Sequence, residues 1–365
     1  MEQRLTKLWY RDAAGPSLLQ PLSWIYATAI RTRRNAYARR WLTAHHVGKP
    51  VIVVGNLTVG GTGKTPLVIW LARHLAGRGL KVGIVSRGYG SQAGEAPRPV
   101  NETSSWRDVG DEPLLLYRST GCATEIGRDR VAAARALVTQ GVDVIIADDG
   151  LQHLRLSRDC EIVVIDGARG FGNGRLLPAG PLREPVSRMA DADVVVVNGV
   201  MEHSSLRRVG MSIESGTIEA RTSRTGAKEA NAFEGRALQM TLLPGDAIRL
   251  DGREPPRPLL AFRGRPVHAV AGIGNPARFF RDLRTRGLDV LEHPFADHHP
   301  FAPRDLSFED DLPVLMTEKD AVKCASFAGP RLWSVPTTAT FSEAQARELL
   351  DHVLRRIESQ TGAGG

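Results

Sequence analysis

The sequence predicts an α/β fold built on a doubly wound parallel sheet, and two observations support it. Short apolar runs alternate with stretches of helical spacing, an order that places helices on both faces of a parallel sheet. A chain of 365 residues with 42% hydrophobic side chains can also bury two cores of ordinary size, so two domains are expected. The predicted strands are Val51–Val54, Val82–Val85, Val142–Ala147, Ile162–Ile165 and Val194–Val197, and the predicted helices of this part are Leu67–Gly79, Glu112–Tyr117 and Gly127–Gln140.

The first predicted strand leads into a glycine-rich turn that is typical of a phosphate-binding loop. Its glycines leave backbone N–H groups free to close around phosphate oxygens, while Lys64 supplies a positive charge and Thr65 a hydroxyl for Mg²⁺. The helix that follows directs its positive end at the anion. We therefore predict a nucleotide site. Its residues are Thr58, Val59, Gly60, Gly61, Thr62, Gly63, Lys64 and Thr65.

One position departs from the strict G-x-x-x-x-G-K-[ST] pattern, because Thr58 stands where that pattern has glycine. A glycine-rich turn between a strand and a helix can also be no more than a tight connection. The run Gly63, Lys64 and Thr65 at the start of the helix favours the nucleotide site over that alternative.

The strand Val142–Ala147 leads into two carboxylates, Asp148 and Asp149. A doubly wound sheet exposes its ligand site at the carboxyl ends of its strands, so this position is similar to the acidic end of a Walker B strand. One carboxylate there can hold the Mg²⁺ that bridges the β- and γ-phosphates, while its neighbour orients the other ligands. The alternative is that Asp-Asp-Gly is only a turn after the strand.

Two further segments, Ser86–Gly90 and Gly110–Pro113, suggest an acceptor site. Arg87, at the end of the second strand, is placed to contact phosphate. Asp111 opens a helix after a loop and can take the proton from an attacking hydroxyl, as a carboxylate does in kinases that transfer to alcohols. Each segment alone could equally be turn chemistry.

The net charge of +8 is concentrated at the N-terminus, where the first 50 residues hold nine Lys/Arg against two Asp/Glu. The same segment holds six of the eleven Trp and Tyr side chains. Aromatic rings favour the headgroup level of a bilayer, and each basic side chain near an anionic surface contributes about 1 kcal/mol. We expect an amphipathic helix that lies on a membrane, because no run approaches the ~20 apolar residues that span one and no cleavable signal is expected.

Two other interpretations of the basic segment were weighed. It could be a helix packed on the body of the protein, with its arginines in solvent. Nucleic acid is not expected as a partner, because no recognisable nucleic-acid module follows and the remaining 315 residues carry a net charge of only +1.

The three cysteines, Cys122, Cys160 and Cys324, exclude two other classes of protein. They are few, odd in number and without metal-ligand spacing, so a disulfide framework or a zinc site is not expected. The chain is expected in the cytosol, and Cys160 is expected to be buried packing because it lies in an apolar run.

Eight short motifs follow one another along the chain, from about residue 50 to about residue 325. They are Gly60–Thr65, Ser86–Gly90, Gly110–Pro113, Asp148–His153, Leu177–Pro185, Gly272–Pro276, Phe295–His299 and Thr317–Asp320. Together they resemble the tetraacyldisaccharide 4′-kinase (lipid A 4′-kinase) family. An ordered set of this length is far more specific than one phosphate-binding loop.

The resemblance implies an ATP- and Mg²⁺-dependent lipid kinase. It would transfer the γ-phosphate of ATP to the 4′-hydroxyl of a tetraacylated glucosamine disaccharide 1-phosphate in lipopolysaccharide biosynthesis. It also implies a peripheral position on the cytoplasmic face of the bacterial inner membrane, with no obligate protein partner. The implied fold is a P-loop NTPase-like domain joined by a hinge-like connection to a smaller α/β lobe, with catalysis between them.

Carried over position by position, the resemblance implies a role for each residue of the site. Asp111 would be the base that activates the hydroxyl, and His298, from the second lobe, would hold and tune that carboxylate. Lys64 would serve the phosphates. The expected Mg²⁺ residues are Thr65, Glu112, Asp148 and Asp149, and the expected acceptor-site residues are Arg87, Gln152, His153, Arg183 and Glu184.

The domain organisation expected from these observations has four parts: a membrane-interface segment over 1–48, a P-loop kinase domain over 49–235, a smaller lobe over 236–356 and a disordered tail over 357–365. The stretch from Glu202 to Pro258 carries no recognised motif, and Thr222–Ala230 in particular is expected to be an insertion.

A competing hypothesis from another class is a P-loop nucleotide switch, such as a metallochaperone or a partitioning ATPase that acts on a protein partner. Its phosphate loop is similar to this one. Against it, Val59 stands where partitioning ATPases have an additional lysine, and Thr317–Asp320 only approaches the guanine-reading pattern.

Overall fold

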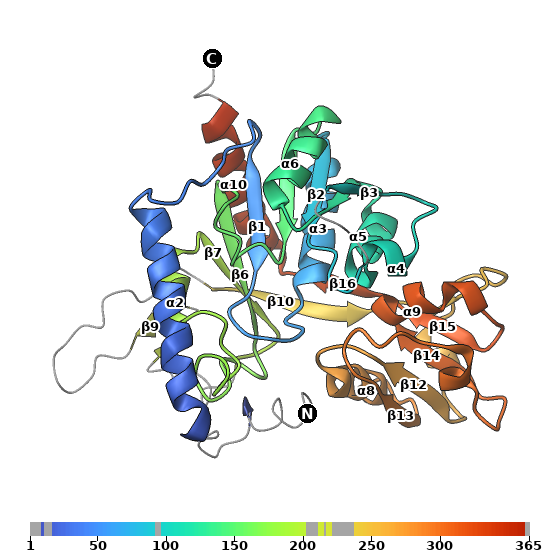
Figure 1. Cartoon of the computed structure of the whole chain (residues 1–365). Coiled ribbons are helices and arrows are strands. Elements are labelled where there is room, and N and C mark those ends of the chain that lie inside the picture. The colour runs from blue at the N-terminus through green and yellow to red at the C-terminus, as the bar shows by residue number, and fades with distance from the viewer. Residues whose placement is uncertain are drawn as a thin grey trace.

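The computed structural model describes residues 9–10, 17–91, 96–201, 211–214, 217–220 and 237–361. Figure 1 shows a larger lobe built on a nine-stranded sheet and a smaller lobe built on a five-stranded sheet. A separate hairpin pairs β8 (Met211–Glu214) with β9 (Thr217–Ala220). The predicted α/β architecture with two lobes is confirmed, whereas the predicted insertion at Thr222–Ala230 lies outside the described residues.

Five parallel strands form the centre of the larger sheet, in the spatial order β7-β6-β1-β5-β2, and they coincide with the five predicted strands. Every residue in them is buried, because runs of Val and Ile suit a sheet that is covered on both faces. Their bounds are Val51–Gly55 (β1), Val82–Ser86 (β2), Val144–Asp148 (β5), Cys160–Asp166 (β6) and Val194–Asn198 (β7).

The edges of this sheet are strands that the sequence analysis did not predict. β4 (Ala123–Ile126) pairs in parallel with β2 and carries the antiparallel β3 (Arg98–Val100). At the other edge, β10 (Ala237–Pro244) pairs in parallel with β7, and β16 (Thr337–Thr340) pairs antiparallel with β10. These strands are short or alternate with polar residues, so their apolar pattern is weak.

Helices cover both faces of the larger sheet, as its doubly wound order requires. The side chains of α3 (Lys64–Ala76) and α10 (Glu343–Thr361) share one core cluster with the sheet, and those of α6 (Arg130–Thr139) belong to the cluster on the other face. The three predicted helices are confirmed: they are α3, α5 (Asp111–Thr120) and α6. A short helix, α4 (Trp106–Val109), precedes α5.

The smaller lobe is a five-stranded sheet in the order β11-β15-β14-β12-β13, with only β11 antiparallel to its neighbour. Its strands are Ile248–Arg249 (β11), Val267–Ala271 (β12), Val290–Pro294 (β13), Val314–Thr317 (β14) and Leu332–Val335 (β15). Its helices are Pro276–Thr285 (α8) and Glu318–Cys324 (α9), with 3₁₀ turns at Leu259–Phe262, Pro303–Leu306 and Ala325–Phe327.

The boundaries of the lobes differ from the predicted ranges 49–235 and 236–356. β10, β16 and α10 belong to the larger lobe, so the predicted smaller lobe is too long at both ends. The chain leaves the larger sheet through β10, which Figure 1 shows running towards the smaller lobe, and returns through β16. The crossing point is fixed where the Gly245 N–H donates to the Pro336 carbonyl at 2.8 Å. No motif marks the returning strand, which is why the sequence did not reveal it.

The C-terminal helix corrects a second boundary. Residues 357–361 belong to α10, and Ile357 is buried in the core, so the predicted disordered tail is wrong for these residues. The rest of that tail, 362–365, lies outside the described residues.

The N-terminal helix, α2 (Gln20–Ala38), lies along the side of the larger lobe and follows the 3₁₀ turn Ser17–Leu19. One side of it packs on the loop 172–185: Ser23 accepts from the Ala179 N–H at 3.0 Å, and the Tyr26 hydroxyl donates to the Arg183 carbonyl at 3.1 Å. The other side exposes apolar groups, with Leu18, Leu22, Trp24 and Ile25 between 52% and 89% exposed. In the part of the chain that the structure describes, no helix is long and apolar enough to span a membrane.

Candidate active site

The phosphate-binding loop, Thr58–Thr65, follows the central strand β1, and polar side chains end the strands beside it. β5 ends in Asp148 and β2 ends in Ser86, so their carboxyl ends meet at the edge of the sheet next to the loop. Gly63 precedes α3 with a φ of 96°, a left-handed value that favours glycine. The predicted juxtaposition of loop and acidic strand end is therefore present.

Lys64 lies at the start of α3 and faces both the loop and the acidic strand end. Its Nζ donates to Asn56 Oδ1 at 3.1 Å and forms an ion pair with Asp149 Oδ1 at 3.4 Å. Because this ammonium is held by one neutral and one charged acceptor, its position is set before any phosphate binds.

Asp149 is held between two cations. Besides Lys64, it accepts two hydrogen bonds from Arg183 Nη1, at 3.0 and 3.1 Å. Burial raises the pKa of Asp149, but the charges of Lys64 and Arg183 outweigh it and hold the pKa well below its usual range. Its φ of 48° is unusual for a residue other than glycine, and such backbone conformations concentrate at functional sites.

Asp148 has the opposite environment. It is 1% exposed, its Oδ2 accepts from the Ser86 hydroxyl at a long 3.4 Å, and its Oδ1 has no hydrogen-bond partner among the described residues. Burial raises the pKa of Asp148 to about 7, and the nearby carboxylates of Glu112 and Asp149 add to the shift. Arg130 donates to the Asp148 backbone carbonyl, not to its carboxylate.

This environment fits a divalent cation. Among the described residues, Asp148 has an unpartnered oxygen and forms no ion pair, although the charges of Lys64 and Arg130 act on it against those of Glu112 and Asp149. Mg²⁺ prefers oxygen ligands and usually takes only one or two carboxylates, with phosphates and water as the rest. No group of three or more His, Cys, Asp or Glu side chains in the described ranges is arranged as a complete metal site. Asp148, with its unpartnered oxygen, is a candidate ligand, and the role expected of Thr65 stays a prediction.

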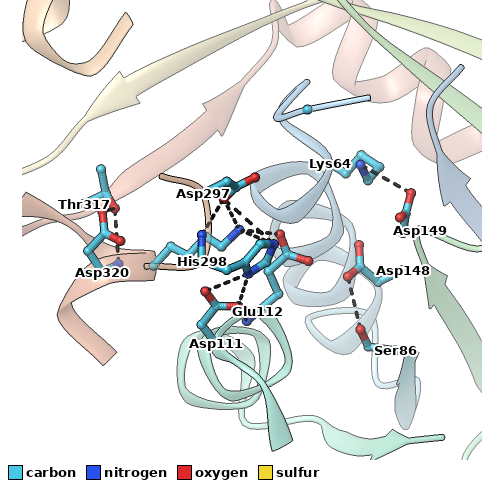
Figure 2. A network of polar contacts seen from close by, with 12 residues as sticks. Lys64, Ser86, Asp111, Glu112, Asp148, Asp149, Asp297, His298, Thr317 and Asp320 are labelled. Atoms are coloured by element: carbon cyan, nitrogen blue, oxygen red, sulfur yellow. Dashed lines mark hydrogen bonds and ion pairs between the residues drawn. The ribbon is translucent and has the colours of Figure 1, made fainter. Parts of the chain in front are cut away.

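The smaller lobe supplies the second half of the site. Figure 2 shows His298 and Asp111 facing each other on one side, with Lys64, Asp148 and Asp149 on the other. His298 Nδ1 lies 3.0 Å from both carboxylate oxygens of Asp111, which opens α5 in the larger lobe. His298 has a φ of 59°, again unusual for a residue other than glycine. The two residues that the sequence predicted as partners are thus brought together.

Two lysines of α9 surround this pair, and the sequence analysis singled out neither. Lys319 Nζ donates to Glu112 Oε1 at 2.9 Å and to Asp297 Oδ1 at 3.0 Å, and it lies 3.3 Å from His298 Nε2. Lys323, 1% exposed, lies 3.5 Å from Asp111 Oδ2. The sequence could have indicated Lys319, because it is the third residue of the motif Thr317–Asp320.

The charges around Asp111 determine its protonation. Burial raises the pKa of Asp111, but the hydrogen bond from His298 and the charges of Lys319 and Lys323 outweigh it and lower the pKa to about 2. Burial lowers the pKa of His298, and the Asp111 hydrogen bond and charge outweigh that effect, so the net shift is upward. Asp111 is therefore ionised at neutral pH.

The remaining predicted acceptor residues occupy different places. Arg183 binds Asp149 and is partly exposed, whereas Arg87 is exposed at the end of β2. Gln152 Nε2 donates to Glu184 Oε1 at 2.9 Å, and Glu184 is 3% exposed. His153 has a buried Nε2, and burial lowers its pKa to about 4. Gln152 and Glu184 therefore bind each other, Gln152 Nε2 also donates to the Asn56 carbonyl at 3.2 Å, and their role at the acceptor site stays a prediction.

Residues 16–355 match the family described as tetraacyldisaccharide-1-P 4′-kinase. The chain belongs to this family. It is 48% identical to the tetraacyldisaccharide 4′-kinase of Alkalilimnicola ehrlichii, with 94% of each chain covered, and 46% identical to that of Xanthomonas axonopodis pv. citri, with 97% of this chain and 96% of the relative covered. The resemblance predicted from the motifs is confirmed, and the nucleotide-switch alternative is not favoured.

A solved structure of the same family supports the fold. The "apo" form of LpxK from Aquifex aeolicus, in complex with ATP, has a TM-score of 0.70 and 28% sequence identity, covering 93% of this chain and 98% of that chain. The tetraacyldisaccharide 4′-kinase family thus accounts for both lobes of the present structure.

Proposed function

We propose that this member of the tetraacyldisaccharide 4′-kinase family transfers the γ-phosphate of ATP to the 4′-hydroxyl of tetraacyldisaccharide 1-phosphate, with the two lobes contributing opposite halves of the reaction. The observation that carries the proposal is the Asp111–His298 pair, which faces the Lys64 side of the site. The acceptor hydroxyl would bind at Asp111 and the ATP phosphates in the loop Thr58–Thr65.

Asp111 has the protonation state that this step needs. A carboxylate with a pKa of about 2 stays ionised at neutral pH and accepts a hydrogen bond from the hydroxyl. As the new O–P bond forms and the bond from Pγ to ADP breaks, the hydroxyl proton passes to an Asp111 oxygen. Phosphoryl transfer has a loose transition state, so orienting the hydroxyl matters more than the strength of the base. His298 would fix the carboxylate in that orientation.

The other half of the site would neutralise the phosphates. Lys64 is held at the loop by Asn56 and Asp149, so its charge would act on the phosphates bound there. Mg²⁺, when bound with ATP, neutralises charge on the β- and γ-phosphates. Asp148 and Thr65 would hold it, while Asp149 stays paired with Lys64 and Arg183. Glu112, which binds Lys319, would act mainly through its charge.

The helix α2 supports a peripheral place on the cytoplasmic face of the bacterial inner membrane. Its outer side exposes Leu22, Trp24 and Ile25, Leu18 is exposed in the turn before it, and arginines follow towards its C-terminal end. Apolar side chains with flanking arginines suit the boundary between acyl chains and anionic headgroups. The acyl chains of the acceptor could then remain in the bilayer while its sugar reaches Asp111.

The direct test is transfer of ³²P from labelled ATP with Mg²⁺ to tetraacyldisaccharide 1-phosphate in detergent micelles. The intact protein should form labelled lipid, and its Lys64→Ala variant should lose about 10² to 10³-fold in rate, as removal of a charge-stabilising group does. Correctly folded, ATP-binding protein that labels no lipid would overturn the proposed acceptor and return attention to a nucleotide switch with a protein partner.

A further inference from the structure

The carbonyl groups of the phosphate loop are held from outside by side chains. Asn56, which is fully buried, donates from Nδ2 to the carbonyls of Thr58 at 2.8 Å and Gly60 at 3.3 Å. Asn198, 2% exposed, donates from Nδ2 to the carbonyl of Thr62 at 2.9 Å.

Two further side chains complete this arrangement. Arg169 Nη2 donates to the Gly61 carbonyl, and the Tyr10 hydroxyl lies 3.5 Å from the Val59 carbonyl, at the long limit of a hydrogen bond. Every carbonyl from Thr58 to Thr62 therefore faces a side-chain donor that comes from outside the loop. We call Asn56, Arg169 and Asn198 the carbonyl clamp.

The clamp leaves the N–H groups of the loop free. Among the described residues, no backbone N–H from Gly60 to Gly63 donates a hydrogen bond. A phosphate loop binds its anion through such N–H groups, and it can do so only if the carbonyls point elsewhere. Asn56 also accepts from Lys64 through Oδ1, so one side chain fixes both the loop and its lysine.

Two members of the clamp also contact the smaller lobe. Asn198 Oδ1 accepts from Arg278 Nη2 of α8 at 2.9 Å, and Arg169 Nη1 donates to the Gly274 carbonyl at 3.2 Å. Gly274 lies so close to the loop that a Cβ built on it would be 2.4 Å from the Gly61 nitrogen. The same side chains therefore bind the loop and the lobe that carries His298.

We propose that Asn56, Arg169 and Asn198 are positioning residues that preorganise the loop for ATP by binding its carbonyls, and that Asn198 and Arg169 couple ATP binding to the contact between the lobes. The inference rests on the proposed ATP site. It predicts that loss of a clamp donor weakens ATP binding far more than lipid binding, because in the described part of the chain neither Asp111 nor His298 bonds to the clamp.

The test uses Asn→Asp substitutions in the full chain. Asn56→Asp keeps the oxygen that binds Lys64 and loses the donor to the loop; Asn198→Asp keeps the acceptor for Arg278 and loses the donor to Thr62. The matched control is Asn173→Asp, because Asn173 donates to the Ala179 carbonyl at 2.9 Å, outside the phosphate loop. Affinity for Mg·ATP is measured by calorimetry without lipid, and KM is measured for ATP and for lipid.

Asn198→Asp should raise the Kd and KM for ATP about tenfold, the effect of one lost buried hydrogen bond, and Asn56→Asp, which loses two, should raise them further; the lipid KM should change less than about twofold. Arg278→Met keeps the loop donor, loses the lobe contact and the 3.8 Å ion pair with Asp282 on its own helix, and should raise the ATP Kd about threefold. Asn173→Asp should leave it unchanged.

The outcomes separate this inference from the proposed function. If the intact protein binds no Mg·ATP, the proposed ATP site itself is lost. If it binds and the clamp variants bind equally well, or if Asn173→Asp costs as much as they do, only the clamp is overturned. Should a buried Asn variant not fold, Arg169→Lys at a partly exposed position keeps a positive charge beside Asp166, removes the guanidinium that binds the Gly61 carbonyl, and tests the same prediction.

Discussion

The two halves of the active site are built in different ways. The phosphate half comes from one continuous loop and the ends of two neighbouring strands. The acceptor half joins Asp111 to His298 across 187 positions of the chain, and Glu112 to Lys319 across 207. The side chains of the first half all belong to the larger lobe, although its clamp contacts Gly274 and Arg278 of the smaller lobe, whereas the second half exists only while the lobes are in contact. Substitutions on the two sides should therefore differ in what they disturb, ATP binding on one side and transfer on the other.

The largest effect should follow from Asp111→Asn, which keeps the size of the side chain and removes its negative charge. We expect kcat to fall about 10³-fold, within the usual range for a group that assists proton transfer, while the Kd for ATP changes little. Single-turnover transfer and calorimetry measure the two quantities.

Asp297→Asn is the matched control, because Asp297 accepts from Lys319 and from the His298 N–H, but none of its contacts among the described residues reaches Asp111. It should retain most activity. Asp111→Asn with normal turnover at saturating lipid would remove the assignment of Asp111 as the base.

Substitution of the two adjacent aspartates of the phosphate half should change the free energy of unfolding in opposite directions. Asp148→Asn removes a buried carboxylate that forms no ion pair among the described residues, so the nucleotide-free protein should gain about 1 kcal/mol of unfolding free energy while transfer falls about 10²-fold. Asp149→Asn removes the partner of Lys64 and Arg183 and should lower the free energy of unfolding.

Urea unfolding without nucleotide and without Mg²⁺ measures this contrast. Loss of stability in Asp148→Asn would contradict the proposal that this carboxylate serves to bind a cation. A gain in stability together with a loss of activity is what a functional, not a structural, carboxylate predicts.

The sequence revealed the phosphate half almost completely, because its residues are neighbours in the chain. Val51–Gly55, the glycines and Lys64 form a local pattern that by itself predicts a phosphate-binding loop. Asp148 could be added because parallel strands end at one edge of a sheet. Asn56 and Asn198 were missed, since a buried amide that binds carbonyls leaves no periodic signal.

The acceptor half could not be predicted from pattern alone. Nothing in the spacing of Asp111 and His298 indicates that they meet, and only the family resemblance paired them. Lys323 was missed because a lysine in a helix is usually a solvated residue, whereas here it is buried beside Asp111 and Asp320. The return of the chain through β16 was missed for a similar reason, because pairing with β10 over a long separation has no local mark.

A smaller effect is expected from His298→Gln, which keeps a polar group and removes the charged partner of Asp111. We expect kcat to fall about tenfold, because the carboxylate stays ionised but is less firmly oriented. The raised pKa of His298 also makes stability depend on pH. The folded state holds this proton more tightly than the unfolded state, so the stabilisation is complete below a pH of about 6.5 and is lost as the pH rises through the folded pKa.

Unfolding free energies of the intact protein and His298→Gln at about pH 5.5 and about pH 9 test the sign. The difference between the two proteins should be larger at the lower pH. A difference that grows with pH would mean that the pair with Asp111 does not favour protonated His298.

The smallest effect concerns the outer side of α2, which belongs to neither half of the site. The double substitution Leu22→Ser and Ile25→Ser removes two exposed apolar side chains, so binding to vesicles of anionic phospholipid should weaken about tenfold, at roughly 0.7 kcal/mol for each partly inserted side chain. Transfer to lipid in detergent micelles should change less than twofold. Leu260→Ser is the control, because Leu260 is 59% exposed but lies in the smaller lobe. Equal loss with that variant, or no loss with the double variant in sedimentation with the vesicles, would show that α2 is not the membrane-facing surface and would favour a helix that serves only to pack on the loop 172–185.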